Sequence, residues 1–176
     1  MTRTGLEVRS ARPGDAGAVT RLLDVIYSEQ RWFVGDAAAS ASSLAARIAA
    51  DDPSRSLYLV AVVGRDLAGW LELHRSPVWR LEHVAVLTLA VAPAYRRHGV
   101  GRSLLRRSYE WCRREGVLKV SLNVRAGNTA AIALYESEGF ALEGRERRQV
   151  RVEPGRDEFE DNLIMGKWLG DAHQAG

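Results

Sequence analysis

Apolar runs alternate along the chain with segments in which apolar positions recur every three or four residues. The apolar and alternating runs predict strands over residues 6–9, 57–63, 67–74 and 84–92. Gly64-Arg65-Asp66 separates two of these runs and predicts a tight hairpin. The run that Pro93 closes is apolar without interruption, so we expect a central strand buried on both faces.

Helical spacing of apolar residues marks the segments between the strands. Helices are predicted over residues 16–27, from Ser42 or Ser43 to 50, over 99–115 and over 129–138. Asp15, in the turn Pro13-Gly14-Asp15, is the expected N-cap of the first helix, and Ser42 or Ser43 that of the second. Gly116 stands where the third helix should end.

The last third of the chain completes the pattern. A strand is predicted over residues 117–124, and a hairpin over 140–152 and 159–169 turns at Pro154-Gly155. The order of strand, two helices, three strands, helix, strand, helix and hairpin predicts an α+β fold with a mixed sheet flanked by about four helices. No repeat or linker divides the chain, so we expect one domain over residues 1–170 and a flexible tail over 171–176.

Composition narrows the class of protein. The 176 residues are 46% hydrophobic and 27% charged, which is typical of a globular domain and excludes disordered, collagen-like and coiled-coil chains. One cysteine and four scattered histidines exclude a disulfide framework and a metal site of ordinary spacing. Cys112 falls on the apolar face of its helix, so we expect a buried thiol and not a nucleophile. Without a signal peptide or membrane span, a soluble cytoplasmic protein is expected.

The charge distribution is more informative than the net charge of +3. Seven arginines crowd one segment: Arg96, Arg97, Arg102, Arg106, Arg107, Arg113 and Arg114. They indicate either an anion site or a solvated helix face. Nucleic-acid binding is the less favoured interpretation, because a net charge this small is first a matter of solubility.

The stretch from Val91 to Arg102 leads from the buried strand into the long helix. Gly99 and Gly101 let the backbone approach an anion closely, and the helix N-terminus offers N–H groups to it. The flanking arginines add charge-assisted contacts to phosphate. The stretch therefore predicts a pyrophosphate cradle, although it is neither a Walker A loop nor a dinucleotide fingerprint.

A second motif follows between Asn123 and Phe140. Together the two stretches resemble the GCN5-related N-acetyltransferases (GNAT family), which use acetyl-CoA. Arg96, Gly99 and Gly101 match the family's R/Q-x-x-G-x-G/A signature, and residues 128–140 match N-x-x-A-x-x-L-Y-x-x-x-G-F at every fixed position. The end of the chain looks most like the branch of L-amino-acid and ribosomal-protein N-terminal acetyltransferases.

The resemblance implies a mostly antiparallel mixed sheet in which residues 84–92 and 117–124 form a splayed parallel pair that receives CoA. Main-chain groups of Leu89, Ala90 and Val91 would bind the pantetheine arm. The residues implied around the pyrophosphate are Arg96, Arg97, His98, Gly99, Val100, Gly101 and Arg102. Asn128 would bind the cofactor through its side-chain amide, and it could equally be the N-cap of the helix that follows.

Tyr135 lies two helical turns beyond Asn128, on the same helix face. In similar enzymes this tyrosine protonates the departing CoA thiolate, for which a phenol that is protonated at neutral pH is suited. The alternative is a core aromatic beside Phe140.

The general base is where the sequence departs from the family. Relatives often carry an acidic residue in the middle of the fourth strand, where this chain has Val86. We expect Glu72 on the neighbouring strand to be the base, with His83 as the second candidate, while Glu82 is better explained as a solvated rim residue. If the acceptor amine binds in its neutral form, no general base is required.

The acceptor site implied by the resemblance lies around the first two helices and the terminal hairpin. Tyr27, Trp32 and Phe33 are the expected contacts, and the acceptor is a primary amine of a small molecule, such as an amino acid, or of a protein N-terminus. No metal, nucleic acid or membrane partner is expected, and a homodimer is left open. The competing interpretation is a non-catalytic acetyl-CoA-binding regulator of the same fold.

Overall fold

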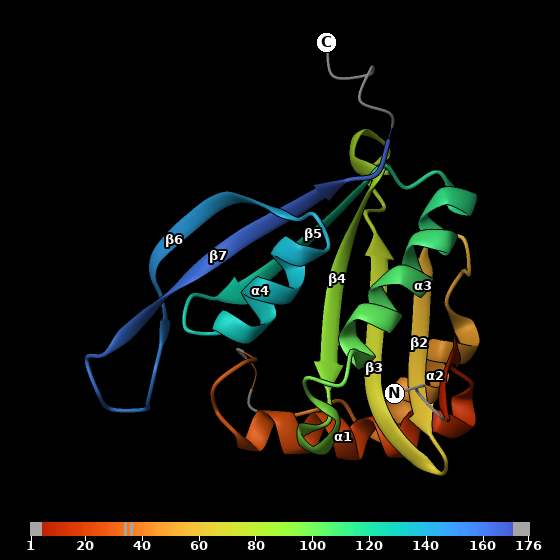
Figure 1. The fold of residues 1–176 in the computed structure, drawn as a ribbon, viewed down its shortest axis with the longest axis horizontal. Coiled ribbons are helices and arrows are strands. Elements are labelled where there is room, and N and C mark those ends of the chain that lie inside the picture. The colour runs from red at the N-terminus through yellow and green to blue at the C-terminus, as the bar shows by residue number, and fades with distance from the viewer. Residues whose placement is uncertain (1–4, 34, 36, 171–176) are drawn as a thin grey trace. The chain divides into compact units, whose positions relative to one another are not determined.

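The computed structural model describes residues 5–33, 35 and 37–170 (Figure 1). The chain divides into two compact units. The first unit runs through His74 and includes Leu87–Glu115, and the second comprises Arg75–Val86 and the chain from Gly116 onward. The predicted tail over 171–176 lies outside the described residues.

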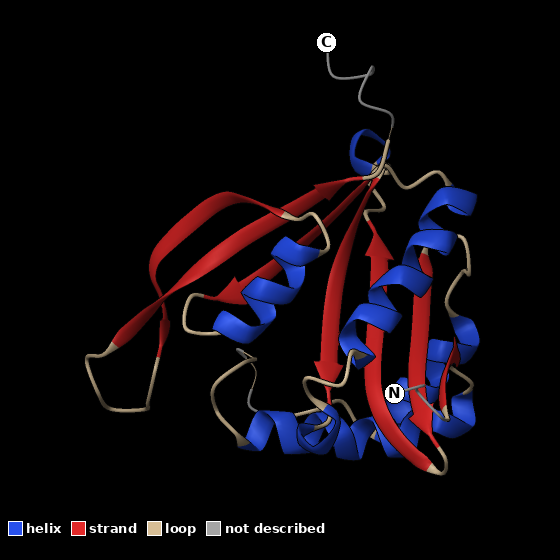
Figure 2. Ribbon diagram, in the orientation of Figure 1, coloured by secondary structure: helices blue, strands red, loops and turns tan. Residues whose placement is uncertain are grey.

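The described residues of the first unit form three α-helices, short 3-10 turns and most of four strands (Figure 2). Its elements are β1 (Leu6–Ser10), α1 (Ala16–Ser28), α2 (Ala41–Ala50), β2 (Ser56–Val63), β3 (Asp66–Arg75), β4 (Val84–Val91) and α3 (Val100–Glu115). β1, β2 and β3 pair antiparallel in succession, with Val60 of β2 opposite Trp70 of β3.

Helices cover both faces of these strands. One face carries Tyr58, Val60 and Trp70, which pack in one buried cluster with apolar side chains of α1 and of α2. Residues on the other face meet α3, whose buried stripe includes Leu104 and Leu105 (Figure 1). The first unit therefore has helix, strand and helix layers, as alternation of side chains along β2 and β3 requires.

A glycine in β3 sets the distance between α3 and the strands. A Cβ atom on Gly69 would lie 2.9 Å from side-chain atoms of Leu104 and Val100 and 3.2 Å from the carbonyl oxygen of Ala90. These distances leave no room for a methyl group on Gly69. The start of α3 therefore packs directly on the backbone of β3.

The second unit is built from the first residues of β4 together with β5 (Lys119–Arg125), α4 (Thr129–Ser137), β6 (Ala141–Arg151) and β7 (Phe159–Trp168). β4 pairs parallel with β5 from Val84 opposite Lys119 to Val86 opposite Ser121, while β5, β7 and β6 pair antiparallel. β4 is thus shared by the two units, in the strand order β1-β2-β3-β4-β5-β7-β6. This confirms the predicted mixed, mostly antiparallel sheet with one parallel pair.

Two local predictions are wrong, and a third holds only in part. Asp15 is the N-cap residue of α1, as predicted, but its carboxylate makes no cap bond to that helix; it accepts N–H bonds from Arg12 and from the guanidinium of Arg9 instead. Ser40 caps α2 by accepting the N–H of Ser43, so the helix begins earlier than the serines at 42 and 43 suggested. Val86 is 51% exposed, so β4 is not buried on both faces along its whole length.

Two expectations about the long helix α3 agree with the structure. Cys112 is fully buried, as predicted, and Gly116 takes the positive φ expected after α3. Across the described part of the chain, no helix is long and apolar enough to cross a membrane. Within that same part, no cluster of three His, Cys, Asp or Glu side chains could hold a metal ion.

We predict that Gly69→Ala lowers the free energy of unfolding by about 1–3 kcal/mol, because the added methyl group overpacks the junction of β3 and α3. Chemical denaturation measures the change. Gly14→Ala is the matched control, since no atom lies within 4 Å of the Cβ it would gain. Equal stability of the two variants would contradict the packing described here.

Candidate functional site

The loop before α3 has the backbone of an anion cradle. Arg97 and Gly99 both take positive φ angles, of 65° and 76°. The carbonyl oxygen of Gly99 accepts the first intrahelical bond from Ser103, at 3.0 Å, so the N–H groups of Val100 and Gly101 precede the helical ladder. N–H groups of this kind at the positive end of a helix dipole favour a phosphate ligand. The residues present therefore fit the pyrophosphate that the sequence predicted.

Side chains beside the cradle stabilise the loop itself. The ring of His98 lies 2.7 Å from the carbonyl oxygen of Arg96 through Nδ1. The hydroxyl of Tyr95 donates to Asp66 at 2.8 Å, which ties the loop to the turn between β2 and β3. The guanidinium of Arg96 donates to Glu29 and to the carbonyl of Val91.

The end of β4 leads directly into this loop. Ala90 is buried, whereas Leu89 and Val91 are half-buried. The N–H of Ala92 donates to Ala68 at 3.0 Å, and the Val91 carbonyl accepts a 3.2 Å bond from Arg96. A carbonyl oxygen has two lone pairs, so the Val91 carbonyl retains acceptor capacity for a further donor.

The second signature motif builds both ends of α4. Asn128 is the N-cap, because its Oδ1 atom accepts the N–H of Ala131 at 3.2 Å. Gly139 ends the helix with a φ of 86°, donating its N–H to Glu136, and Phe140 donates to the carbonyl of Tyr135 at 3.0 Å. These two bonds form a Schellman motif. The cap uses only Oδ1, so the Asn128 amide N–H₂ keeps its donor capacity.

Tyr135 is fixed by this helix end. Its ring packs on that of Phe140, with centroids 5.5 Å apart, and only 7% of the residue is exposed. Burial raises the pKa of the Tyr135 phenol, because the apolar surroundings disfavour the phenolate. The phenol is therefore protonated through the neutral range. The contact with Phe140 also agrees with the alternative role of a core aromatic residue. Burial is therefore consistent with both the proton donor and the core residue.

A buried ion pair that the sequence did not reveal holds the loop before α4. Arg125, 5% exposed, donates to Oε2 of Glu160 from two nitrogens at 2.7 and 2.6 Å. The other oxygen, Oε1, accepts the N–H of Gly127 at 2.6 Å. A Cβ atom on Gly127 would lie 2.5 Å from that oxygen, so a side chain there would displace the Glu160 carboxylate. Glu160 thus fixes the backbone just before Asn128.

Glu72 lies on the face of β3 that α2 covers. Its Oε2 atom accepts a 2.9 Å bond from Arg47 of α2, and the Nε2 atom of His74 lies 3.6 Å away. The side chain is 16% exposed. Arg47 in turn lies over the ring of Tyr58, which faces Glu72 in the strand pairing. The predicted base is thus a half-buried carboxylate that already has a cationic partner.

His83 belongs to the second unit, just before β4. The residue is half-buried, and its ring lies 6.4 Å from that of Trp168. Its backbone carbonyl accepts the N–H groups of Leu118 and Lys119 at 2.9 and 3.0 Å. The backbone of His83 therefore takes part in the start of the parallel pairing. Its neighbour Glu82 is exposed, in agreement with a solvated residue.

The three predicted acceptor contacts lie at the end of α1 and in the loop that follows it. The rings of Tyr27 and Phe33 are tilted against each other at 5.2 Å, and Trp32 and Phe33 pack at the edge of the first unit's core. Burial raises the pKa of Tyr27, and the charge of Glu72 adds to the effect. Tyr27 therefore lies within electrostatic reach of the predicted base.

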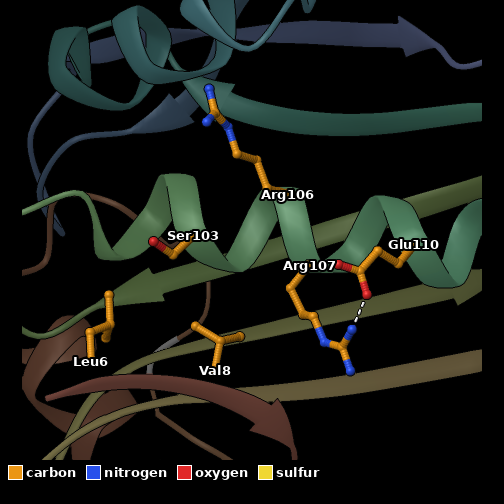
Figure 3. Close-up of a pocket in the computed structure, with 6 residues that line it drawn as sticks. All are labelled: Leu6, Val8, Ser103, Arg106, Arg107 and Glu110. Carbon is orange, nitrogen blue, oxygen red and sulfur yellow. Dashed lines mark hydrogen bonds and ion pairs between the residues drawn. The ribbon is translucent and has the colours of Figure 1, made fainter. Parts of the chain in front are cut away.

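A separate hollow of about 390 Å³ lies between β1 and α3 (Figure 3). It is lined by Leu6, Val8, Ser103, Arg106, Arg107 and Glu110. The charged groups of Arg107 and Glu110 are paired with each other across one turn of α3. No predicted site residue is among the lining residues, so this hollow is not the site that the sequence motifs describe.

Comparison with known proteins decides the family. The profile of the acetyltransferase (GNAT) family matches residues 22–140, which is well over half of the chain. The chain belongs to the GNAT family. It is 44% identical over 85 residues to the ribosomal protein bS18-alanine N-acetyltransferase of Escherichia coli, covering 48% of this chain and 55% of that protein. It is also 30% identical over 161 residues to the streptothricin acetyltransferase of Streptomyces lavendulae, covering 78% and 82%.

Solved structures agree in fold. yncA of Salmonella typhimurium, solved with its cofactor acetyl-CoA, superimposes with a TM-score of 0.86 over 96% of each chain at 21% identity, which shows the GNAT fold alone. The chain spans about half the length of the bS18-alanine acetyltransferases it matches.

We predict that Gly139→Ala lowers the free energy of unfolding by about 1–2 kcal/mol, because a side chain is disfavoured at that φ, and also reduces acetyl transfer by loosening Tyr135. Gly116→Ala, at the end of α3, is the matched control, with a φ of 72° and open space around its Cβ. It should lose similar stability and keep its activity. Equal activities of the two variants would show that the end of α4 does not position Tyr135 for the reaction.

Proposed function

We propose that the protein is an acetyl-CoA-dependent N-acetyltransferase that transfers the acetyl group to a primary amine. The observation that carries this proposal is the loop before α3, where Arg97 and Gly99 take positive φ angles and the helix N-terminus offers backbone N–H groups suited to an anion. Membership of the GNAT family supports it. Residues 97–102 would hold the pyrophosphate, the end of β4 the pantetheine arm, and the Asn128 amide a further polar group of acetyl-CoA.

The reaction is a direct attack on the thioester. The neutral amine forms a bond to the acetyl carbon, the C–S bond breaks, and the products are an N-acetyl amide and CoA. Tyr135 gives its phenolic proton to the departing thiolate, and a general base takes the proton that the amine loses. The raised pKa of Tyr135 keeps the phenol protonated through the neutral range, as a proton donor requires.

Glu72 is the proposed base, and His83 is the second candidate. Glu72 is supported by its half-buried carboxylate and by its electrostatic effect on Tyr27, which is one of the proposed acceptor contacts. A carboxylate near the acceptor also attracts the ammonium form of the amine. Arg47 would then hold the carboxylate in place.

The acceptor is proposed to be either an amino acid or the N-terminal amine of a protein. The similarity to bS18-alanine N-acetyltransferases favours a protein amine, and the aromatic side chains of Tyr27, Trp32 and Phe33 suit an apolar residue beside that amine. Both units are proposed to belong to one acetyltransferase domain, because the family match runs through both of them. A cytoplasmic location stays a prediction.

We predict that the protein releases CoA thiol from acetyl-CoA in the presence of one class of amine, tested on amino acids, polyamines, aminoglycosides and short peptides. Tyr135→Phe should lower kcat about a hundredfold, as expected for loss of a general acid. Tyr109→Phe removes another buried phenol, on α3, and should retain activity. Saturable acetyl-CoA binding without turnover on any amine would favour the non-catalytic regulator.

We predict that Glu72→Gln lowers kcat/KM about a hundredfold and removes the acidic limb of the pH–rate profile, because the amide cannot accept a proton. Arg47→Gln is the control that breaks the same ion pair and keeps the carboxylate. An equal loss in both variants would mean that the pair is structural. If neither Glu72→Gln nor His83→Ala changes the profile, neither residue is the base.

A further inference from the structure

The guanidinium of Arg96 makes hydrogen bonds to two other segments of the protein. Its Nε atom donates to the carbonyl oxygen of Val91 at 3.2 Å, and Nη2 donates to Oε1 of Glu29 at 2.6 Å. The first bond anchors the guanidinium to the end of β4, and the second joins it to the end of α1. The ion pair is partly shielded, with side-chain exposures of 36% for Arg96 and 23% for Glu29.

Glu29 uses its second oxygen for another segment. Oε2 accepts the indole N–H of Trp32, while Oε1 holds Arg96. Glu29 is the C-cap residue of α1, and Gln30 after it takes a φ of 50°, which turns the chain sharply. This turn brings Trp32 back to the carboxylate. One carboxylate thus bridges the loop before α3 and the residues that follow α1.

This bridge is hard to reconcile with phosphate binding by the Arg96 side chain. To reach a phosphate group, the guanidinium would have to leave Glu29, and a half-buried carboxylate would then face the same anion without its cation. A guanidinium that stays in place neutralises Glu29 instead. The backbone N–H groups of the cradle can hold the phosphate without Arg96.

We infer that Arg96 and Glu29 are positioning residues that tie the segment 29–33 (the acceptor segment) to the cofactor loop before α3. The inference rests on the proposed function, in which Trp32 contacts the acceptor and the loop binds acetyl-CoA. Arg96 acts on acceptor binding through Glu29 and Trp32, and it is not itself a ligand of the phosphates. The arginine of the first signature motif thereby gains a structural explanation.

The test uses Arg96→Gln, Glu29→Gln and the double variant, with Arg113→Gln on the exposed end of α3 as a control for loss of an arginine charge. Calorimetric titration with acetyl-CoA gives its Kd, and steady-state kinetics with the fastest amine of the panel give the acceptor KM. We expect acetyl-CoA Kd values within about threefold of the wild type for Glu29→Gln and for the double variant. Arg96→Gln should bind acetyl-CoA more weakly than the double variant does, because it leaves the Glu29 carboxylate unpaired. The acceptor KM should rise about tenfold in each single variant and no further in the double variant.

The opposite pattern would overturn the inference. If the double variant, which has no unpaired carboxylate, binds acetyl-CoA tenfold or more weakly than Glu29→Gln does, Arg96 is a phosphate ligand. Additive effects of the two substitutions on the acceptor KM would also contradict the bridge.

Failure of the proposed function gives a different result, namely a wild-type protein that does not bind acetyl-CoA or does not turn over any amine. The bridge is then tested by the free energies of unfolding of the wild type, the two single variants and the double variant. Non-additive losses would keep the Arg96–Glu29 tie as a structural feature, whereas additive losses would exclude it.

Discussion

The close packing of α3 on β3 is the constraint on which the candidate site depends. Gly69 lacks the Cβ atom that would collide with Val100 and Leu104, so the first turn of the helix lies directly on the strand. The chain must therefore pass from β4 to α3 through a short loop, and the positive φ angles of Arg97 and Gly99 make that passage possible. The anion binding that we propose at the helix N-terminus would follow from this geometry.

Residues with local roles could be predicted from the sequence. In the second motif, Asn128 caps α4, Gly139 ends it and Phe140 packs on Tyr135, and each role depends on neighbours within about one helical turn. The elements themselves followed from hydrophobic periodicity for the same reason, with errors of only a few residues at their ends. The predicted GNAT fold is confirmed by the family match.

Interactions between distant parts of the chain could not be predicted in this way. Glu29 and Arg96 are 67 residues apart, and Arg125 and Glu160 are 35 residues apart, so no spacing rule connects them. The exposure of Val86 likewise depends on what packs on that face of β4, which an apolar run does not reveal. Each ion pair joins an arginine and a glutamate that look isolated in the sequence. The two pairs hold the loops before α3 and α4.

The most direct test of the central claim is a titration of the isotope-labelled protein with acetyl-CoA, followed through its backbone amide resonances. If the cradle before α3 binds the pyrophosphate, the amides of Gly99, Val100 and Gly101 shift in a saturable manner, and those of Arg113 and Arg114 at the far end of α3 do not. Saturable shifts confined to the far end of α3, or to the hollow lined by Leu6 and Val8, would contradict the claim.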